Sequence, residues 1–526
     1  NETKKLNIFG WESINPAYGG AGSGGINDLY DIVSLNQGLE NAGFSINQDL
    51  VDFYNNYGAD NPEMSIQKQS WTLPEPPADT YSDELIESAK EYSDVAVVVL
   101  SRKAGEGHND IPMDVSKAAY DNNSDAYDDF PEGEHYLQLS QTEKDMVDMV
   151  CDNFDDVIVI YNGANQFELG FTDEYPQIKS VVWCPGTGNV GFNALGKVFS
   201  GEVNPSGKTP DTFIYDMTTA PWWNNGEKIE YTNLADMAVE GMNAGSPQVY
   251  APAFTNYVEG IYVGYKYYET AAQEGFIDYD KTVQYPFGYG LSYTEFEQKM
   301  GELEEKDGQI SVDVEVTNTG DVAGKDVVEV YYNPPYTNGG IEKASANLIE
   351  FAKTDLLQPG DSQTVTVTFD VEDMASYDAN EIKVAGGGYI LEAGEYTVSV
   401  RSDSHTVLDQ ATFTVDSDIN YSESARTTDN VVATNQLNDY TAGNVTYLSR
   451  ADGFANYAEA TAAPAEEAYV MDDATRKEVE ANSTAYYDST AYDNAEDTMP
   501  TLGSDNGLTL ADLTGKAYDD PMWDQL

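Results

Sequence analysis

Residues 1–215 alternate short apolar runs with segments of helical periodicity. The run Val95–Leu100 is apolar without interruption, which is typical of a strand buried on both faces of a parallel sheet. The pattern predicts strands at Leu6–Phe9, Val95–Leu100, Val157–Ile160 and Ser180–Trp183, and helices at about Asn27–Ala42 and Ser140–Phe154. Ser140 and Glu143 have capping-box spacing at the start of the second helix. Strands separated by helices indicate an α/β layer with a largely parallel sheet.

The pattern changes to strict alternation of apolar and polar residues in the region 296–418. Alternation marks strands with one face buried, and turn signals such as Gln358-Pro359-Gly360-Asp361 separate them. The predicted strands are Gln309–Val316, Asp326–Tyr332, Gln363–Phe369, Gly394–Val400 and Ala411–Val415. We expect an immunoglobulin-like or fibronectin-type β-sandwich.

Two further regions show little periodicity. Residues 216–280 are rich in Tyr, Asn and Trp, and we expect an excursion with exposed aromatic rings that stack on sugars or pack against a neighbouring domain. Residues 419–526 indicate an extended linker with one short helix around Asp472–Asn482. The predicted domains are therefore 1–295, with the insertion 216–280, then 296–418 and 419–526.

Charge narrows the classes of partner. Among 526 residues, 92 are acidic and 26 basic, a formal net charge of −66. Such a field repels nucleic acid and anionic membrane surfaces, and it suits a protein that stays soluble outside the cell, so we expect secretion. The chain holds no apolar run of about 18 residues that would predict a membrane span.

Cysteine and histidine usage is sparse. The two cysteines, Cys151 and Cys184, lie in apolar surroundings and are predicted to be buried thiols, which excludes a disulfide framework and a zinc motif. Three well-separated histidines provide no histidine-based metal site. We expect neither a metal nor another cofactor.

The loop that follows Val95–Leu100 holds the strongest candidate chemistry. Catalytic groups gather where parallel strands end, and here Glu106 stands between two glycines. A solvated acidic loop is the alternative. The glycine-rich segment 19–25 lacks a Gly-Lys-Ser/Thr sequence and a GxGxxG register. Tight turns that let a sugar or another domain approach the backbone closely are therefore favoured over a phosphate site.

Several motifs, taken in order, resemble glycoside hydrolase family 3, the β-glucosidase and β-xylosidase family. They are Gly105-Glu106-Gly107, Trp183-Cys184-Pro185-Gly186-Thr187-Gly188, the segment 201–213 (GEVNPSGKTPDTF), the segment 259–268 (EGIYVGYKYY), the segment 285–293 (YPFGYGLSY) and Val316-Thr317-Asn318-Thr319-Gly320. The resemblance implies an (α/β)6-type sandwich, a fibronectin III-like β-sandwich, and a linker like that of members whose (β/α)8 barrel follows these domains.

The resemblance also assigns roles. Retaining glycosidases use two carboxyl groups about 5 Å apart. Glu106 corresponds to the family's acid/base, whereas the nucleophile is an aspartate of a Ser-Asp-Trp motif on the barrel, and this sequence has no Ser-Asp-Trp. The predicted substrate-binding residues are Arg102, His108 and Asp110. The usual Gly-Glu-Gly-x-Asp-Arg is replaced by Gly105-Glu106-Gly107-His108-Asn109-Asp110, which puts the role of Asp110 in doubt, and Arg102 is equally readable as a surface charge.

The leading hypothesis is therefore part of a secreted, exo-acting β-glycosidase that acts on a carbohydrate substrate. Its barrel is expected on a separate chain, removed by cleavage, or beyond this sequence. The first alternative is a non-catalytic carbohydrate-binding or assembly protein, and the second is a stand-alone hydrolase that pairs Glu106 with another carboxylate of this chain. The sequence leaves a homo-oligomer open.

Overall fold

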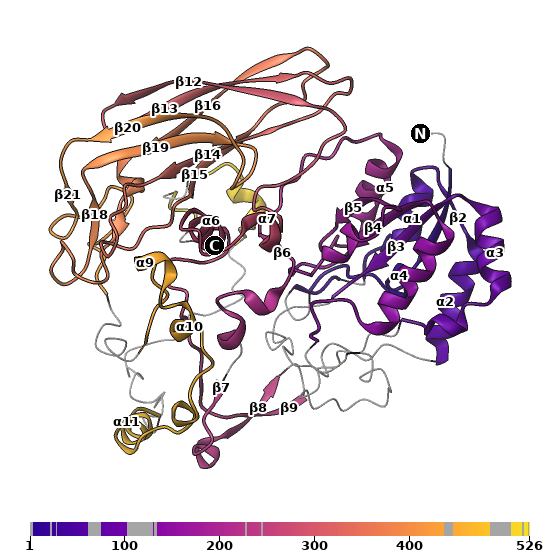
Figure 1. The fold of residues 1–526 in the computed structure, drawn as a ribbon, viewed down its shortest axis with the longest axis horizontal. Coiled ribbons are helices and arrows are strands. Elements are labelled where there is room, and N and C mark those ends of the chain that lie inside the picture. Colours follow the sequence, from indigo (N-terminus) through magenta and orange to yellow (C-terminus); the bar gives the residue numbers. More distant parts are fainter. Residues whose placement is uncertain are drawn as a thin grey trace. The chain divides into compact units, whose positions relative to one another are not determined.

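The computed structural model describes residues 4–20, 24–27, 29–60, 75–102, 130, 134–226, 229–243, 246–435, 445–483, 507–517, 520–523 and 525. The chain divides into two compact units, Asn1–Tyr469 and Val470–Leu526. The first unit contains the α/β layer and the β-sandwich (Figure 1). The second contains helix α11, Asp473–Ser483, and a turn at Leu510–Leu513, so the short helix predicted at Asp472–Asn482 is confirmed.

A five-stranded parallel sheet forms the centre of the α/β layer. Its order is β2-β1-β3-β4-β5, and its strands are β1 (Lys5–Phe9), β2 (Ser45–Ile46), β3 (Val95–Leu100), β4 (Asp156–Tyr161) and β5 (Ile178–Trp183). Five of the six residues of β3 are buried, which confirms that an uninterrupted apolar run marks a strand covered on both faces. The predicted fold class, α/β followed by all-β, is also confirmed.

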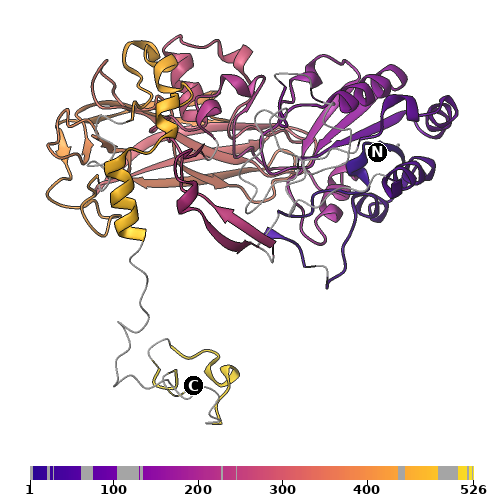
Figure 2. The ribbon, with the colours of Figure 1, turned by 90° about the horizontal axis from the view of Figure 1, so that it is seen from below.

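Helices cover both faces of this sheet (Figures 1 and 2). One face packs against α1 (Leu35–Asn41) and α5 (Phe192–Ser200), and the other against α2 (Gln48–Asp60), α3 (Asp83–Tyr92) and α4 (Gln141–Asn153). Residues of β3 alternate between the two cores: Val97 and Val99 belong to the α1/α5 side, Val98 and Leu100 to the other. The capping box predicted from Ser140 and Glu143 is present at the start of α4.

Helix α1 is shorter than the predicted helix Asn27–Ala42. It begins after Ser34, whose side chain accepts a hydrogen bond from the backbone N–H of Gln37 at 3.1 Å. Leu29 and Ile32, which suggested a helical apolar face, are 88% and 39% exposed. The N-cap serine therefore sets the start of the helix, and these two apolar side chains do not face the core.

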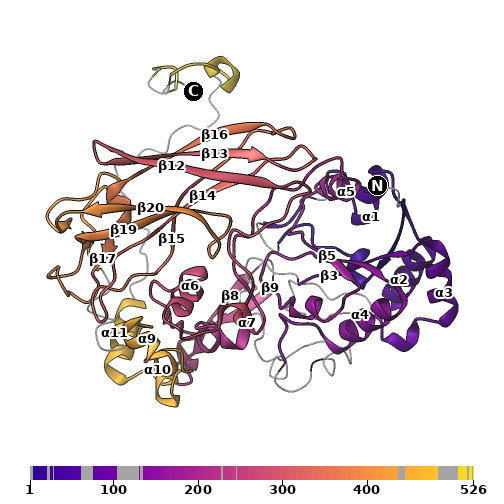
Figure 3. The ribbon, with the colours of Figure 1, turned by 45° about the horizontal axis from the view of Figure 1, so that its top comes forward.

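The sandwich consists of two antiparallel sheets stacked as layers (Figure 3). The sheet β12-β13-β16 faces the sheet β15-β14-β19-β20 across a core of alternating apolar residues. The strands are β12 (Phe296–Lys306), β13 (Gln309–Asn318), β14 (Val327–Asn333), β15 (Asn347–Lys353), β16 (Ser362–Asp370), β19 (Gly394–Arg401) and β20 (Val407–Val415). The sequence pattern did not predict β12 and β15, because both are edge strands in which a register shift interrupts the alternation.

Shorter elements connect these layers. They are β6 (Phe213–Ile214), β7 (Ile229–Glu230), β8 (Val239–Asn243), β9 (Ser246–Tyr250), β10 (Ala253–Phe254), α6 (Tyr265–Gln273), α7 (Tyr279–Thr282), β11 (Val283–Tyr285), β17 (Ser376–Tyr377), β18 (Tyr389–Leu391), β21 (Ile419–Asn420), α9 (Ala451–Phe454) and α10 (Tyr457–Ala460).

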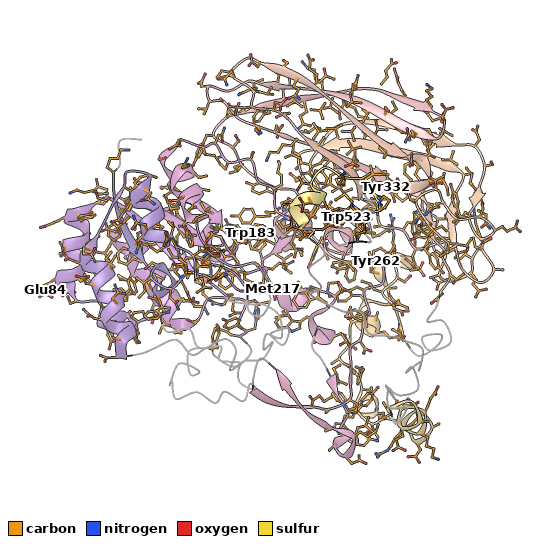
Figure 4. All side chains as sticks on the ribbon, turned by 180° about the vertical axis from the view of Figure 1, so that it is seen from behind. Glu84, Trp183, Met217, Tyr262, Tyr332 and Trp523 are labelled. Atoms are coloured by element: carbon orange, nitrogen blue, oxygen red, sulfur yellow. The ribbon has the colours of Figure 1, made fainter. Side chains whose placement is uncertain are left out.

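The aromatic residues of 216–280 include a buried cluster, so the expectation of an exposed excursion is wrong for them. Met217 and Tyr262, labelled in Figure 4, belong to one apolar cluster with Tyr267 and Tyr268. Phe454, from the region predicted as a linker, packs into the same cluster, with its ring centroid 5.2 Å from that of Tyr262. The rings thus pack against a segment far along the chain but within the same compact unit, whereas the expectation was a neighbouring domain.

The β19–β20 hairpin of the sandwich contacts helices α6 and α7. The ring of His405 stacks on that of Tyr279, with centroids 3.7 Å apart and planes 9° from parallel. Its Nδ1 lies 2.9 Å from Oε2 of the buried Glu269, and Tyr279 donates its hydroxyl to Oε1 of the same carboxylate at 2.7 Å. Glu269 thus links the helices to the sandwich.

Candidate functional site

The loops that leave the carboxyl ends of four parallel strands line one pocket. The cavity has a volume of about 540 Å³, and its described lining comes from residues 17–20 and 24–27 after β1, Arg102 after β3, Ala164 after β4, and Pro185, Gly186, Gly188 and Asn189 after β5. This is the edge at which open α/β sheets bind ligands. The described lining residues include no Asp or Glu.

Glycine lets two of these loops meet closely. A Cβ on Gly186 would lie 3.1 Å from both the Cα of Gly19 and the carbonyl oxygen of Tyr18. The backbone N–H of Gly188, a residue with φ of +63°, donates to that same carbonyl at 2.6 Å. The close approach expected from the glycine-rich segment 19–25 is therefore made, in part, by another loop of the chain.

Asn162 joins three of the loops. It follows β4 directly and is fully buried, and its Oδ1 accepts from the backbone N–H of Ala17 at 2.6 Å. Its Nδ2 donates to the carbonyl oxygens of Ala17 and Cys184, at 3.2 and 2.8 Å. Ser101 donates its hydroxyl to the Asn162 carbonyl at 2.5 Å. One amide thus connects the ends of β1, β4 and β5 while its own backbone holds the end of β3.

Arg102 holds the segment that follows β3. Its guanidinium forms a bidentate ion pair with Glu143, with N–O distances of 2.8 and 2.6 Å. Nε and Nη2 donate to the carbonyl oxygens of Tyr136 and Gln138, both at 2.5 Å, and Nη1 donates to that of Ser101 at 2.9 Å. The Arg102 clamp, meaning Arg102 with Glu143 and these carbonyls, therefore joins the start of segment 103–135 to the residues just after it.

The clamp is buried and satisfied. Arg102 is 1% exposed and lies over the ring of Phe167, 4.7 Å from its centroid. Burial by itself lowers the pKa of Arg102, but the Glu143 carboxylate outweighs this and leaves the pKa above its usual value. All five guanidinium N–H groups have an acceptor, so none remains for a ligand. The alternative that Arg102 is a surface charge is wrong, and its bonds give it a positioning role in place of the predicted substrate contact.

The other predicted site residues, Glu106, His108 and Asp110, lie outside the described residues. Close to the clamp, sequence reasoning missed His135, which is 1% exposed and has its Nε2 3.0 Å from Glu168 Oε1. Its Nδ1 accepts a hydrogen bond from the Leu137 N–H at 3.2 Å, so the ring hydrogen is on Nε2, which donates a hydrogen bond to Glu168.

Two further residues of the site carried only partial signals in the sequence. Glu143 was predicted for its capping spacing alone, and Asn162 could have been found as a polar residue directly after a buried strand.

Trp183, labelled in Figure 4, lies in the sequence just before the pocket-lining residues Pro185 and Gly186. It ends β5, and its indole N–H donates to the Gly163 carbonyl at 2.7 Å. Cys151 is buried as predicted, whereas Cys184 is only partly buried. Within the described ranges, no group of three or more His, Cys, Asp or Glu side chains could hold a metal ion, and no helix is long and apolar enough to cross a membrane.

Comparisons with known proteins agree with this architecture. Residues 1–293 match the glycosyl hydrolase family 3 C-terminal domain, and residues 326–404 match the fibronectin type III-like domain. A beta-glucosidase from Ruminococcus albus is 33% identical over 415 residues, which are 78% of this chain and 38% of that protein. Beta-glucosidase A from Butyrivibrio fibrisolvens is 34% identical over 415 residues, which are 74% of this chain and 45% of that protein. The chain thus spans less than half the length of these relatives.

Solved structures show the same similarity. A beta-glucosidase from Paenibacillus barengoltzii superposes with a TM-score of 0.63 at 29% identity, over 79% of this chain and 41% of that one. Beta-glucosidase 3B from Thermotoga neapolitana, in complex with alpha-D-glucose, gives a TM-score of 0.61 at 29% identity, over 80% of this chain and 51% of that one. The similarity extends through both the α/β layer and the sandwich.

Proposed function

Because the chain belongs to glycosyl hydrolase family 3, we propose that it forms part of a retaining, exo-acting β-glycosidase of the β-glucosidase type. Its substrate is a terminal, non-reducing β-linked sugar. Glu106 is the acid/base, and the nucleophilic aspartate comes from a (β/α)8 barrel, either in the same protein or in a partner chain. The relatives named beta-glucosidases support the substrate class.

The observation that carries this proposal is the Arg102 clamp at the carboxyl edge of the sheet. Arg102 stands four positions before Glu106, and its side chain also holds the carbonyls of Tyr136 and Gln138, beyond the far end of the same segment. The described residues on the two sides of the segment that contains Glu106 are therefore held together beside the pocket. Effective acid/base catalysis depends on such positioning.

The proposed acid needs a raised pKa to hold its proton near neutral pH. A carboxyl acquires one through burial or through a neighbouring carboxylate. The described lining of the pocket provides no carboxylate, so in this proposal the barrel supplies the nucleophile and the enclosure together. His108 and Asp110 are proposed to contact the substrate beside Glu106.

A second candidate function is a non-catalytic carbohydrate-binding or assembly protein derived from such an enzyme. The lack of Asp and Glu among the described residues that line the pocket favours it. In that case the fold keeps a sugar-facing pocket without the pair of carboxyl groups that hydrolysis requires.

The test compares substrates with good and poor leaving groups, using the protein together with everything that co-purifies. An activated 2-deoxy-2-fluoro glucoside should label the nucleophile, and intact mass should identify the labelled chain. Glu106→Gln should slow hydrolysis of poor leaving groups about 10²–10⁴-fold, and that of dinitrophenyl glucosides far less, since the latter need no protonation. Glu84→Gln, at an exposed site on α3 labelled in Figure 4, is the matched control.

Two results would overturn the proposal. Unchanged rates in the Glu106→Gln variant on poor leaving groups would remove the acid/base role. The absence of both labelling and turnover, with bound sugar still detectable, would establish the non-catalytic alternative.

A further inference from the structure

A second cavity lies beside helix α4. Its volume is about 600 Å³, and it is lined by the residues that lead into α4, by one side of that helix, by the 3-10 turn Gly170–Asp173 with the residues after it, and by Tyr215. We name it the α4 cleft. It shares no lining residue with the pocket of the glycine-rich loops, but it touches the same scaffold, because Arg102 holds the carbonyl of the lining residue Gln138.

Three aromatic side chains form the apolar part of the α4 cleft: Phe171, Tyr175 and Tyr215. Phe171 and Tyr175 also pack, partly buried, against the main core. The ring of Tyr215 lies close over Gly170, where a Cβ would come within 2.7 Å of its Cδ1. The backbone and core therefore hold these rings in place before any ligand arrives, which lowers the entropy cost of binding.

Hydrogen bonds orient the two tyrosines. Tyr175 donates its hydroxyl to Asp148 on α4, and Tyr215 donates to Asp173 Oδ2 at 2.8 Å. Burial, the larger cause, and the hydrogen bond to Asp173, the second, raise the pKa of Tyr215 to about 12, so its hydroxyl stays protonated at neutral pH. In contrast, no described residue hydrogen-bonds to the side-chain amide of Gln138 or to the carboxylate of Glu174. The cleft thus combines fixed rings with unoccupied polar groups.

The charges of the cleft exclude an anionic ligand. Among the described residues that line it, Asp148, Glu168 and Glu174 are acidic and Lys144 alone is basic. Lys144 is itself paired with Glu134 at 2.6 Å. A neutral ligand with a flat C–H face and a rim of hydroxyls matches both parts of the lining, since the face suits the rings and the hydroxyls suit the amide and carboxylate. Pyranose rings have this chemistry.

We propose that the α4 cleft is a secondary binding site for a neutral β-linked oligosaccharide, with one sugar ring against Tyr175 and Tyr215 and its hydroxyls on Gln138 and Glu174. The choice of a β-linked sugar rests on the proposed function. The cleft binds a part of the oligosaccharide that is not being hydrolysed, because no Asp or Glu among its described lining residues is fully buried.

The experiment is calorimetric titration of the full chain with thio-linked cellotetraose, which resists hydrolysis. Tyr215→Ala and Gln138→Ala should each weaken binding about tenfold, whereas Tyr215→Phe, which keeps the ring, should retain most of the affinity. Tyr257→Ala is the matched control, since Tyr257 is 78% exposed and lies outside the cleft. Near-UV circular dichroism verifies that each variant is folded.

Further comparisons separate this inference from the proposed function. Glu106→Gln should leave the affinity for the thio-sugar unchanged, and Tyr215→Ala should leave the hydrolysis of a simple aryl glucoside unchanged. Absence of binding by the unsubstituted chain, or equal affinity in the Tyr215→Ala variant, would overturn the site. Binding of oligogalacturonate or spermidine in preference to the neutral sugar, with the same dependence on Tyr215, would overturn the ligand class.

Discussion

Glu143→Gln removes one charge from the Arg102 clamp and changes little else. The amide has the shape of the carboxylate, and glutamine at this position of α4 still accepts the hydrogen bond of a capping box. One amide oxygen remains to accept from the guanidinium, while the amide nitrogen faces it as a second donor. The variant therefore isolates the cost of a buried guanidinium without its counter-ion.

The magnitude follows from the burial of the pair. The Arg102 side chain is fully buried and that of Glu143 is 5% exposed, so water cannot replace the lost partner. Removing one partner of a buried ion pair costs about 3–5 kcal/mol. Two charge-assisted hydrogen bonds at roughly 1.5–3 kcal/mol each lead to a similar figure. We therefore expect the free energy of local unfolding of β3 and α4 to fall by about 3–5 kcal/mol.

The assay is amide hydrogen exchange of β3 and α4 peptides in a urea series, because exchange reports the local stability of one part of a chain with several domains. Glu84→Gln should change the protection by less than about 0.5 kcal/mol. The double variant Arg102→Met/Glu143→Leu should lose less of this local stability than Glu143→Gln alone, because it leaves no unpaired charge buried. If Glu143→Gln lowers the local stability of β3 and α4 by less than about 1 kcal/mol, the Arg102 clamp does not hold the end of β3 to the start of α4.

Three other perturbations test the scaffold. Gly10→Ala should prevent stable folding of the α/β layer, because Gly10 has φ of +100° and a Cβ would lie 2.2 Å from the Val99 carbonyl oxygen; normal expression and melting temperature would contradict this. Asn162→Asp should cost roughly 1–3 kcal/mol in urea unfolding, since it loses the donors to the main-chain carbonyls of Ala17 and Cys184, and an unchanged midpoint would argue against its linking role. The hydrogen bond to Glu269 raises the pKa of His405 in the folded state. Its stabilisation is therefore full below about pH 6.5 and is lost as pH rises through the raised pKa, so His405→Asn should lower the melting temperature more at pH 5.5 than at pH 8.5, and equal effects would contradict the ion pair.

Local patterns in the sequence determined the fold class and the central elements of the secondary structure. The uninterrupted run Val95–Leu100 specified a strand covered on both faces, and the alternation in Gln309–Asn318 specified one covered on a single face. The spacing of Ser140 and Glu143 specified the start of α4. These features depend on neighbours within a few positions, which is why they could be predicted without knowledge of the rest of the chain.

Tertiary structure alone decided the roles of the polar residues at the site. Arg102 looked like a substrate contact or a surface charge, because nothing near it in the sequence indicates that Glu143, 41 positions away, neutralises it inside the fold. Asn162 likewise joins Ala17 to Cys184 across 145 and 22 positions. A buried polar group is tolerated only where it finds its partners. Partners so distant in sequence come together only when the strands lie side by side in the sheet. The fold, and not the local pattern, therefore determined which polar and charged side chains hold the loops of the site.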